Sequence, residues 1–390
     1  MSHKRIYLDY ASTTPVDPAV EKEMRRFWRV DFGNPGSIHA EGLQAKKAVD
    51  EARTKIARLL HGHADEIVFT GSGTEANNLA IFGVAHIAFE KTKNWSKLHF
   101  MTSVIEHSSV LECFKELERR GAWVDYISVN EEGVVNTKEL ISKICSETVL
   151  VSIQYANSEI GTVQGIRGIF NQIKNAASSV FPKSARPIFH TDASQATQYL
   201  NISQDYLGSD LVTFDAQKIY GPKGIGALYV RRRVELKPLI FGGGQERGLR
   251  AGTENVPLIV GFAKAFELAD ARREKESARL TALRDYAIEK ILKEIPKAVL
   301  NGALEARLPN NINISIPGLD AEFAVLKLDT VGIACATKSA CVSSEEASYV
   351  IVALRKGSEY SHSSLRFSLG RVTKKSDIDF LCKALKSIAS

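Results

Sequence analysis

The amino-acid sequence predicts an α/β protein with a mainly parallel sheet of seven strands covered by helices, and with a second, smaller α+β domain. Between residues 66 and 230, short β-rich runs alternate with helical patterns, which is the order expected of a parallel sheet. After residue 257 this alternation gives way to one long, highly charged helical pattern. The chain has 390 residues, 44% of them hydrophobic, which is enough for a large core and two domains.

The larger domain is expected to span residues 15–257. It begins with a helix, because apolar residues recur at helical spacing between Leu43 and Leu59. The seven strands follow as apolar, β-rich runs at residues 67–69, 98–101, 123–127, 149–153, 188–190, 211–214 and 227–230. In an open α/β sheet, ligands bind beyond the carboxyl ends of the strands, so the residues that follow each strand are the first candidates for a site.

The smaller domain is expected to combine residues 1–14 with residues 258–390. A long helix from Leu258 to about Ile295 would carry the chain to it. Further helices are predicted over residues 322–328 and near the end of the chain, and strands at residues 313–316 and 364–368.

Charge and cysteine content disfavour several classes of protein. The formal net charge is 51 − 45 = +6, spread over the whole chain, and predicts no direct nucleic-acid partner. No apolar stretch is long enough for a signal peptide or a membrane span, so a cytoplasmic protein is expected. The five cysteines form no Cys-x-x-Cys pair, which disfavours a disulfide framework or a metal site and leaves thiol chemistry open. Cys113, Cys145 and Cys382 are interpreted as buried and inert, and Cys335 as structural.

A glycine-rich turn, Thr70–Ala76, follows the first strand and opens a helix. Such a turn lets backbone amides at a helix N-terminus approach a phosphate, although it is also an ordinary connection between a strand and a helix. The same residues fit the dinucleotide fingerprint G-x-G-x-x-A. That alternative requires an acidic residue about 20 positions later at the end of the next strand, and neither Glu90 nor Glu106 meets both conditions.

A carboxylate and an amine follow two later strands. Asp192 ends the strand that starts at residue 188, and Lys218 comes 218 − 192 = 26 residues later. A pyridoxal cofactor requires this pair, because an amine forms the Schiff base and a carboxylate keeps the pyridine nitrogen protonated. Taken alone, the two residues are better explained as a surface lysine and a strand-capping aspartate, because functional lysines are rare among surface ones.

Ten sequence blocks, in order along nearly the whole chain, make the sequence resemble the cysteine desulfurases. The blocks are Tyr7–Pro15, Gly33–Pro35, Thr74–Asn78, Glu106–His107, Asn157–Gly161, Asp192–Gln195, Lys218–Gly224, Arg250–Thr253, Ser339–Cys341 and Ser364–Gly370. The resemblance implies a fold type I pyridoxal-phosphate enzyme of the class V aminotransferase group that works as a homodimer.

The resemblance also implies a role for each site residue. Lys218 would hold pyridoxal phosphate and then move the substrate α-proton. Asp192 would pair with the pyridine nitrogen and Gln195 with the ring oxygen. His107 would stack on the ring and assist proton transfer, although by itself it fits a core histidine as well.

The remaining implied contacts concern the phosphate and the substrate. Thr74 and the amide of Gly73 would bind the phosphate, and Thr253 would reach the phosphate of the neighbouring subunit. Asn157 would contact the cofactor and, with Arg366, would hold the substrate carboxylate.

Cys341 is the expected nucleophile. It lies in a run of small polar residues, and a thiol on a loop can attack the substrate sulfur and then carry the persulfide to an acceptor. The resemblance leaves that acceptor open between an iron–sulfur scaffold and a tRNA-thiolation protein. The rival readings are another class V enzyme, such as a selenocysteine lyase or an aminotransferase, and a scaffold that has lost catalysis.

The chain departs from the family pattern just before Lys218. Asp215 and Gln217 stand where members carry Ser and His, and that serine donates a hydrogen bond to the phosphate. Two like charges near 4 Å repel by about 4 kcal/mol at an effective dielectric constant of about 20. Asp215 would therefore turn away, be protonated or weaken binding, and our hypothesis is that the phosphate is held with lower affinity.

Overall fold

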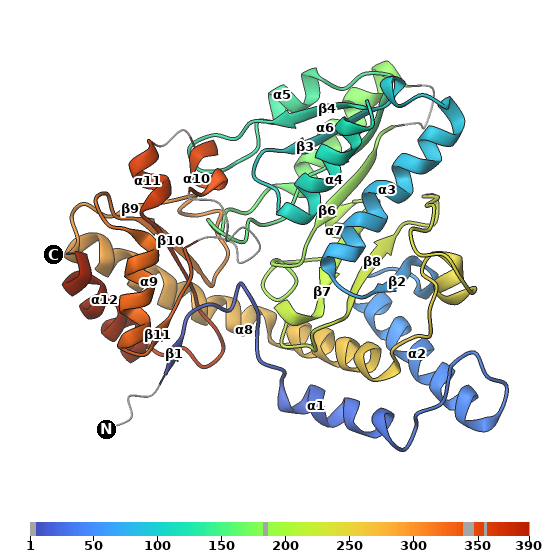
Figure 1. Ribbon diagram of the computed structural model, residues 1–390, viewed down its shortest axis with the longest axis horizontal. Coiled ribbons are helices and arrows are strands. Elements are labelled where there is room, and N and C mark those ends of the chain that lie inside the picture. The colour runs from blue at the N-terminus through green and yellow to red at the C-terminus, as the bar shows by residue number, and fades with distance from the viewer. Residues whose placement is uncertain (1–4, 182–185, 338–346, 355–356, 390) are drawn as a thin grey trace.

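A seven-stranded sheet lies at the centre of the larger part of the computed structural model, which describes residues 5–181, 186–337, 347–354 and 357–389 (Figure 1). Its strands are β2 (Ile67–Thr70), β3 (His99–Ser103), β4 (Trp123–Ile127), β5 (Thr148–Ser152), β6 (Ile188–Asp192), β7 (Leu211–Asp215) and β8 (Gly226–Val230). Their order is β2-β8-β7-β6-β5-β3-β4. β8 runs antiparallel to both of its neighbours, and the other pairs are parallel. The predicted mainly parallel sheet of seven strands is confirmed.

Helices cover both faces of this sheet, which explains why its strands read as nearly continuous apolar runs. Side chains on one face, such as Val68, pack with α3 (Gly73–Thr92) and α4 (Ser108–Arg119). The other face carries Phe69, Val212 and Phe214 and packs with helices that precede and follow the sheet. These helices are α1 (Pro18–Arg25), α2 (Ala40–Leu59), α6 (Ile166–Val180) and α8 (Val256–Glu294). The short helices α5 (Thr137–Ser142) and α7 (Gln204–Leu207) complete this part.

The C-terminal part of the chain builds two smaller sheets. One is antiparallel and consists of β9 (Val299–Leu300), β10 (Asn311–Ser315) and β12 (Ser364–Ser368). The other pairs β1 (Ile6–Tyr7) with β11 (Ile333–Ala334) in parallel, so the N-terminus joins this part. Its helices are α9 (Ala321–Thr330), α10 (Tyr349–Ala353), α11 (Ser358–His362) and α12 (Lys375–Ala389).

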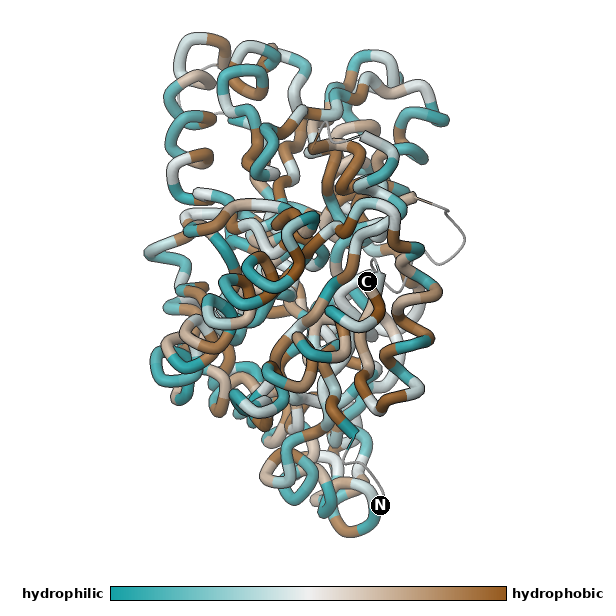
Figure 2. Tube along the Cα trace, turned by 90° about the vertical axis from the view of Figure 1, so that its left-hand side faces the viewer, coloured by the Kyte–Doolittle hydropathy of each residue, from teal (hydrophilic) through white to brown (hydrophobic). Residues whose placement is uncertain are grey.

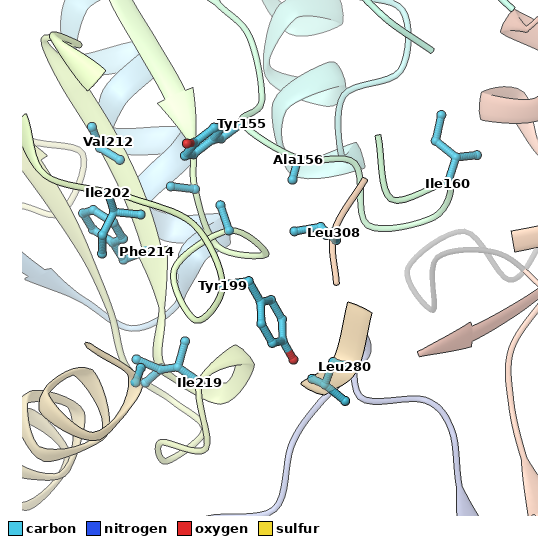
Figure 3. Packing of buried hydrophobic residues seen from close by; sticks show 14 of the residues in the cluster. Tyr155, Ala156, Ile160, Tyr199, Ile202, Val212, Phe214, Ile219, Leu280 and Leu308 are labelled. Carbon is cyan, nitrogen blue, oxygen red and sulfur yellow. The ribbon is translucent and has the colours of Figure 1, made fainter. Parts of the chain in front are cut away.

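Helix α8 runs along both parts of the molecule (Figure 1). Its 39 residues contact α1 and α2 near one end and α12 near the other. The hydrophobic core is continuous across the same boundary, where Leu280 of α8 and Leu308 lie near Tyr199 (Figure 3). The boundaries of the two domains stay a prediction.

The outer helices alternate hydrophilic and hydrophobic segments along the chain trace (Figure 2), as expected when one face of each helix is buried. No helix in the described part of the chain combines the length and the apolar character needed to cross a membrane.

Candidate functional site

The carboxyl ends of the parallel strands open into a cavity of about 270 Å³. Asp192 and Asp215 are the last residues of β6 and β7, and both line it. Ala11 and Ser12 reach the cavity from the N-terminal segment, and Arg366 reaches it from β12. The cavity is close to the lower end of the size range for small-molecule sites, roughly 300 Å³.

Lys218 lies in the short turn that follows β7, and its amine faces the N-terminal segment. Nζ donates hydrogen bonds to the carbonyl oxygens of Ala11, at 2.9 Å, and Ser12, at 2.6 Å. The amide nitrogen Nε2 of Gln195 donates to the same Ala11 oxygen at 2.9 Å. Lys218 and Gln195 are therefore fixed side by side against one stretch of backbone, and both line the cavity.

The Asp192 carboxylate is oriented by two donors. Oδ1 accepts a hydrogen bond from the backbone of Ser194 at 2.9 Å, and Oδ2 accepts one from Asn77 Nδ2 at 2.8 Å. Each oxygen keeps a second lone pair for a ligand. Asn77 lies on α3 and lines the cavity, and it belongs to the sequence block Thr74–Asn78, although its type and spacing alone predicted no role for it.

His107 belongs to the same hydrogen-bond network. Asn77 Nδ2 also donates to Ser109 Oγ at 2.8 Å, and Ser109 Oγ lies 2.9 Å from His107 Nδ1. The backbone amide of Ser109 donates to Nδ1 at 3.2 Å, so in the neutral ring the proton is assigned to Nε2. Asn77 and Ser109 thus connect the carboxylate to the imidazole, and no periodic pattern in the sequence could have paired them.

The glycine-rich turn contacts the buried carboxylate of Asp215. The amide of Gly73 donates to Asp215 Oδ2 at 3.2 Å, and the amide of Gln217 donates to Oδ1 at 3.1 Å. Asp215 is only 8% exposed. The Asp215 carboxylate thus faces the turn, and its response to a bound phosphate, whether by turning away, by protonation or by weaker binding, stays a prediction. Thr74 lies beside it in the first turn of α3 and is exposed.

Arg366 is buried in β12 and is 1% exposed. Nη2 donates to Asp9 Oδ1 and Ser12 Oγ, both at 2.7 Å, and Nη1 donates to the backbone oxygen of Ser158 at 3.2 Å. Nε has no hydrogen-bond partner among the described residues. A buried N–H without an acceptor costs roughly 1–3 kcal/mol, so an acceptor in the cavity would be stabilised there.

Two predicted residues do not line the cavity, and a third lies outside the described residues. Asn157 is buried outside the cavity lining, with Nδ2 on the Ile105 carbonyl at 2.9 Å and Oδ1 on the amides of residues 159 and 160. Thr253 is exposed and does not line the cavity. Cys341 lies outside the described residues.

Glu106 is a buried carboxyl group that sequence reasoning considered only for a dinucleotide site. Oε1 accepts hydrogen bonds from Ser103 Oγ at 2.6 Å and from the amide of Gln154 at 2.9 Å, whereas Oε2 has no partner among the described residues. Burial raises the pKa of Glu106 to about 8, and the nearby Asp192 adds to this increase. The Glu106 carboxyl group is therefore mainly neutral at pH 7, so it adds little negative charge near Asp192.

The lining residues fit a pyridoxal phosphate, with one exception. The polar partners that the cofactor and an amino acid need include the amine of Lys218 and the oriented carboxylate of Asp192. They also include Asn77 Oδ1 and Arg366 Nε, which have no hydrogen-bond partner among the described residues. The exception is Asp215, whose charge lies where a phosphate would be expected.

Known proteins match nearly the whole chain. The family described as Aminotransferase class-V matches residues 6–381. The cysteine desulfurase IscS of Dictyoglomus turgidum is 43% identical over 386 residues, which are 99% of this chain and 94% of that protein. The solved structure of a NifS-like protein has a TM-score of 0.90 at 34% identity and covers 99% of both chains.

A further solved structure, SspA in complex with cysteine, has a TM-score of 0.79 at 34% identity and covers 94% of this chain and 99% of that one. These matches set aside the dinucleotide-binding alternative. The chain belongs to the class-V aminotransferase family and, within it, to the cysteine desulfurases.

Proposed function

We propose that this protein is a pyridoxal-phosphate-dependent cysteine desulfurase, which converts L-cysteine to L-alanine and transfers the sulfur to Cys341 as a persulfide. The observation that carries the proposal is the convergence of Lys218, Asp192 and Arg366 on one cavity. An amine, a carboxylate and a guanidinium match the cofactor aldehyde, the pyridine nitrogen and the substrate carboxylate. The cysteine desulfurase relatives and the cysteine complex of SspA support the choice of substrate.

Pyridoxal phosphate, when bound, supplies an electron sink for the negative charge that develops at the substrate Cα. Lys218 would hold the cofactor through Nζ, and the same amine would accept the substrate α-proton. Asp192 keeps the pyridine nitrogen protonated, and Asn77 and Ser194 hold its carboxylate in position for this. His107 assists proton transfer through Nε2, because the backbone amide of Ser109 donates a hydrogen bond to Nδ1.

Arg366 binds the substrate carboxylate in this proposal. Its charge is already balanced by Asp9, so the substrate adds hydrogen bonds to a guanidinium that the protein has pre-positioned. The unpaired Nε offers one of these bonds. Asn157 then acts as a support, because its side chain fixes the backbone next to Ser158, which lines the cavity.

Cys341 takes the sulfur from the substrate. The Cys341 thiol and L-cysteine give L-alanine and a Cys341 persulfide, which balances all atoms. The persulfide then passes to an acceptor protein, either an iron–sulfur scaffold or a tRNA-thiolation protein. A cytoplasmic location belongs to this proposal, because a reducing compartment keeps such thiols free.

A homodimer is also part of the proposal, with Thr253 directed to the phosphate of the neighbouring subunit. Thr253 is exposed, as this role requires. Three large apolar side chains are exposed as well: Phe32 at 70%, Ile38 at 92% and Phe241 at 83%.

The decisive experiment measures alanine and sulfide from L-cysteine, with purified protein, added cofactor and a reductant. Cys341→Ala is expected to reduce sulfide release to background while visible absorbance by the bound cofactor remains. Lys218→Ala is expected to lose that absorbance, and Cys145→Ala serves as the cysteine control with unchanged activity.

Two results would contradict the proposal. Sulfide release that persists in Cys341→Ala would favour a selenocysteine lyase or an aminotransferase. A wild-type protein that gains no Lys218-dependent absorbance from the cofactor would favour a scaffold without catalysis.

A further inference from the structure

A second cluster of reactive side chains lies at the amino ends of the strands, on the edge of the sheet opposite the cavity. His99 and Thr148 are the first residues of β3 and β5, and Asp125 lies within β4. Cys145 stands in the connection between α5 and β5. The sequence could not group them, because His99 and Cys145 are separated by 46 residues and meet only through strand pairing.

The imidazole of His99 is held in one orientation. Its Nε2 lies 3.1 Å from Asp125 Oδ2, and Asp125 Oδ1 accepts a hydrogen bond from Lys143 at 2.8 Å. The ring is fully buried and stacks on Trp123, with 4.0 Å between ring centroids. Burial lowers the pKa of His99, so the ring is neutral, and because the carboxylate accepts the Nε2 proton, Nδ1 keeps a lone pair that can accept a proton.

The thiol of Cys145 lies at this base. Sγ is 3.5 Å from His99 Nδ1 and 3.5 Å from Thr148 Oγ1, and Thr148 Oγ1 is 2.9 Å from Nδ1. The thiol proton has a direct path to the imidazole and a second path through the threonine hydroxyl. The backbone amide of Cys145 donates to Thr148 Oγ1 at 2.9 Å, which fixes the hydroxyl between the two groups.

Cys145 is also accessible, which corrects its interpretation as a buried cysteine. It is partly exposed, whereas Cys113 and Cys382 are buried as predicted. Burial raises the pKa of the Cys113 thiol to about 12 and that of Cys382 to about 11. Within the described residues neither thiol has a hydrogen bond to an imidazole, so both serve as references for an unassisted cysteine in the same protein.

We propose that Cys145 is a modification site for small disulfides, with His99 as its general base and Asp125 as the residue that positions the base. Sγ attacks one sulfur of the disulfide, the disulfide bond breaks, and a mixed disulfide forms on Cys145. The thiol proton passes to His99 Nδ1 and then to the departing thiolate. One disulfide and one thiol give one mixed disulfide and one thiol, so no further oxidant is needed.

The charge beside the thiol selects the reagent. The exposed carboxylate of Glu147 interacts with the Cys145 side chain. The negative charge of Glu147 disfavours a free thiolate at Cys145, so the thiol needs a base such as His99 to accept its proton. The same charge repels anionic disulfides and favours neutral or cationic reagents. We therefore expect cystamine to react faster than glutathione disulfide, and Glu147→Gln to reduce that preference.

The first test compares the folded and unfolded chain at pH 7. The cofactor-loaded protein is treated with cystamine, and the rate of modification of the Cys145 peptide is followed by mass spectrometry, with and without denaturant. We expect Cys145 to react on the order of tenfold faster in the folded protein, although unfolding makes it more accessible. A folded-state rate equal to or below the unfolded-state rate would overturn the proposal.

The second test compares substitutions of two carboxylates that pair with the same lysine, Lys143. Asp125 and Glu139 both pair with Lys143, but only Asp125 contacts His99. Asp125→Asn is expected to slow the folded-state reaction about tenfold and to leave the unfolded-state rate unchanged. Glu139→Gln is expected to leave both rates unchanged, and an equal loss in the two variants would show that His99 has no part in the reaction.

Discussion

Asp215 illustrates how one residue can change the affinity of a site without changing the fold. Its carboxylate accepts the Gly73 amide at the start of α3 and two donors of Gln217. A helix N-terminus stabilises an anion, so the protein has already supplied the anion that this position favours. A phosphate must displace the carboxylate or bind next to its charge.

This competition predicts a difference between two forms of the cofactor. Asp215→Ser is expected to tighten the binding of pyridoxal phosphate by about tenfold, or 1.4 kcal/mol, because the repulsion is removed. Pyridoxal, which lacks the phosphate, should bind the variant and the wild type alike. Absorbance titration of the apo-protein with both compounds measures this, and an equal change for the two would contradict the explanation.

Glu106 makes stability depend on pH. Its pKa of about 8 exceeds the ordinary value of 4.5, so between these values the native state holds a proton that the unfolded state has lost. Its contribution to stability is complete below about pH 4.5 and is lost as the pH rises to about 8, at about 1.4 kcal/mol per pH unit.

Glu106→Gln should remove this dependence, since the amide resembles the neutral carboxyl group and does not ionise. We expect the free energy of unfolding of the variant, relative to wild type, to increase steadily from about pH 5 to about pH 8 in urea titrations. Glu112→Gln on the exposed face of α4 is the control and should show no trend. A constant difference across this range would mean that Glu106 is ionised in the native protein.

Lys218 and Asp192 could be predicted as neighbours because both follow parallel strands, and strand ends meet at one edge of a sheet. Asn77, Ser109 and Glu106 could not be assigned in this way. Their positions depend on which face of a helix or which end of a turn meets the cavity, and a single sequence does not specify this.

At the scale of elements, strand β8 positions the glycine-rich turn. Gly226 pairs with both Thr70 and Asp215 across the sheet. A Cβ atom at Gly226 would lie 2.6 Å from the Ser72 carbonyl carbon and 2.8 Å from the Phe214 oxygen. The missing side chain therefore lets the turn lie against the strand.

Gly226→Ala is expected to destabilise the protein by about 1–3 kcal/mol, because the contacts are to backbone atoms that cannot move independently. Gly168→Ala in α6 is the matched control: it meets no atom within 4 Å and should stabilise the helix by up to about 1 kcal/mol. Urea unfolding of both variants gives the comparison, and similar effects in the two would exclude the backbone contact as the cause.

The long regular elements were predictable, and the shortest ones were not. Apolar, β-rich runs of several residues predict the seven strands of the main sheet. Longer helical patterns predict helices α2, α8, α9 and α12. β1, β9 and β11 contain two residues each, too few to show a period, and they form only because the surrounding chain brings their partners together.

At the scale of the whole molecule, the exposed apolar side chains predict self-association. Phe32 and Ile38 precede α2, and Phe241 belongs to a segment that Glu246 ties to α2 through its ion pair with Arg53. Large exposed apolar groups on connected elements are typical of an interface.

We therefore expect a mass in solution of twice 42.9 kDa by light scattering. Ile38→Asp should shift the protein toward the monomer, because an interface core excludes an unpaired charge. Phe323→Asp on α9, 53% exposed in the C-terminal part, is the control and should leave the mass unchanged. A monomeric wild type would contradict the expectation.

The two ends of the chain close the cavity together, since Asp9 and Ser12 hold Arg366 while Ala11 and Ser12 hold Lys218. A ribosome releases residue 9 early in synthesis and residue 366 more than 350 residues later. The nascent protein can thus complete its main sheet while still attached, but it has no finished pocket until the final strand has emerged. Assembly of the pocket accordingly waits for β12, and a chain truncated before β12 would retain a sheet without a substrate site.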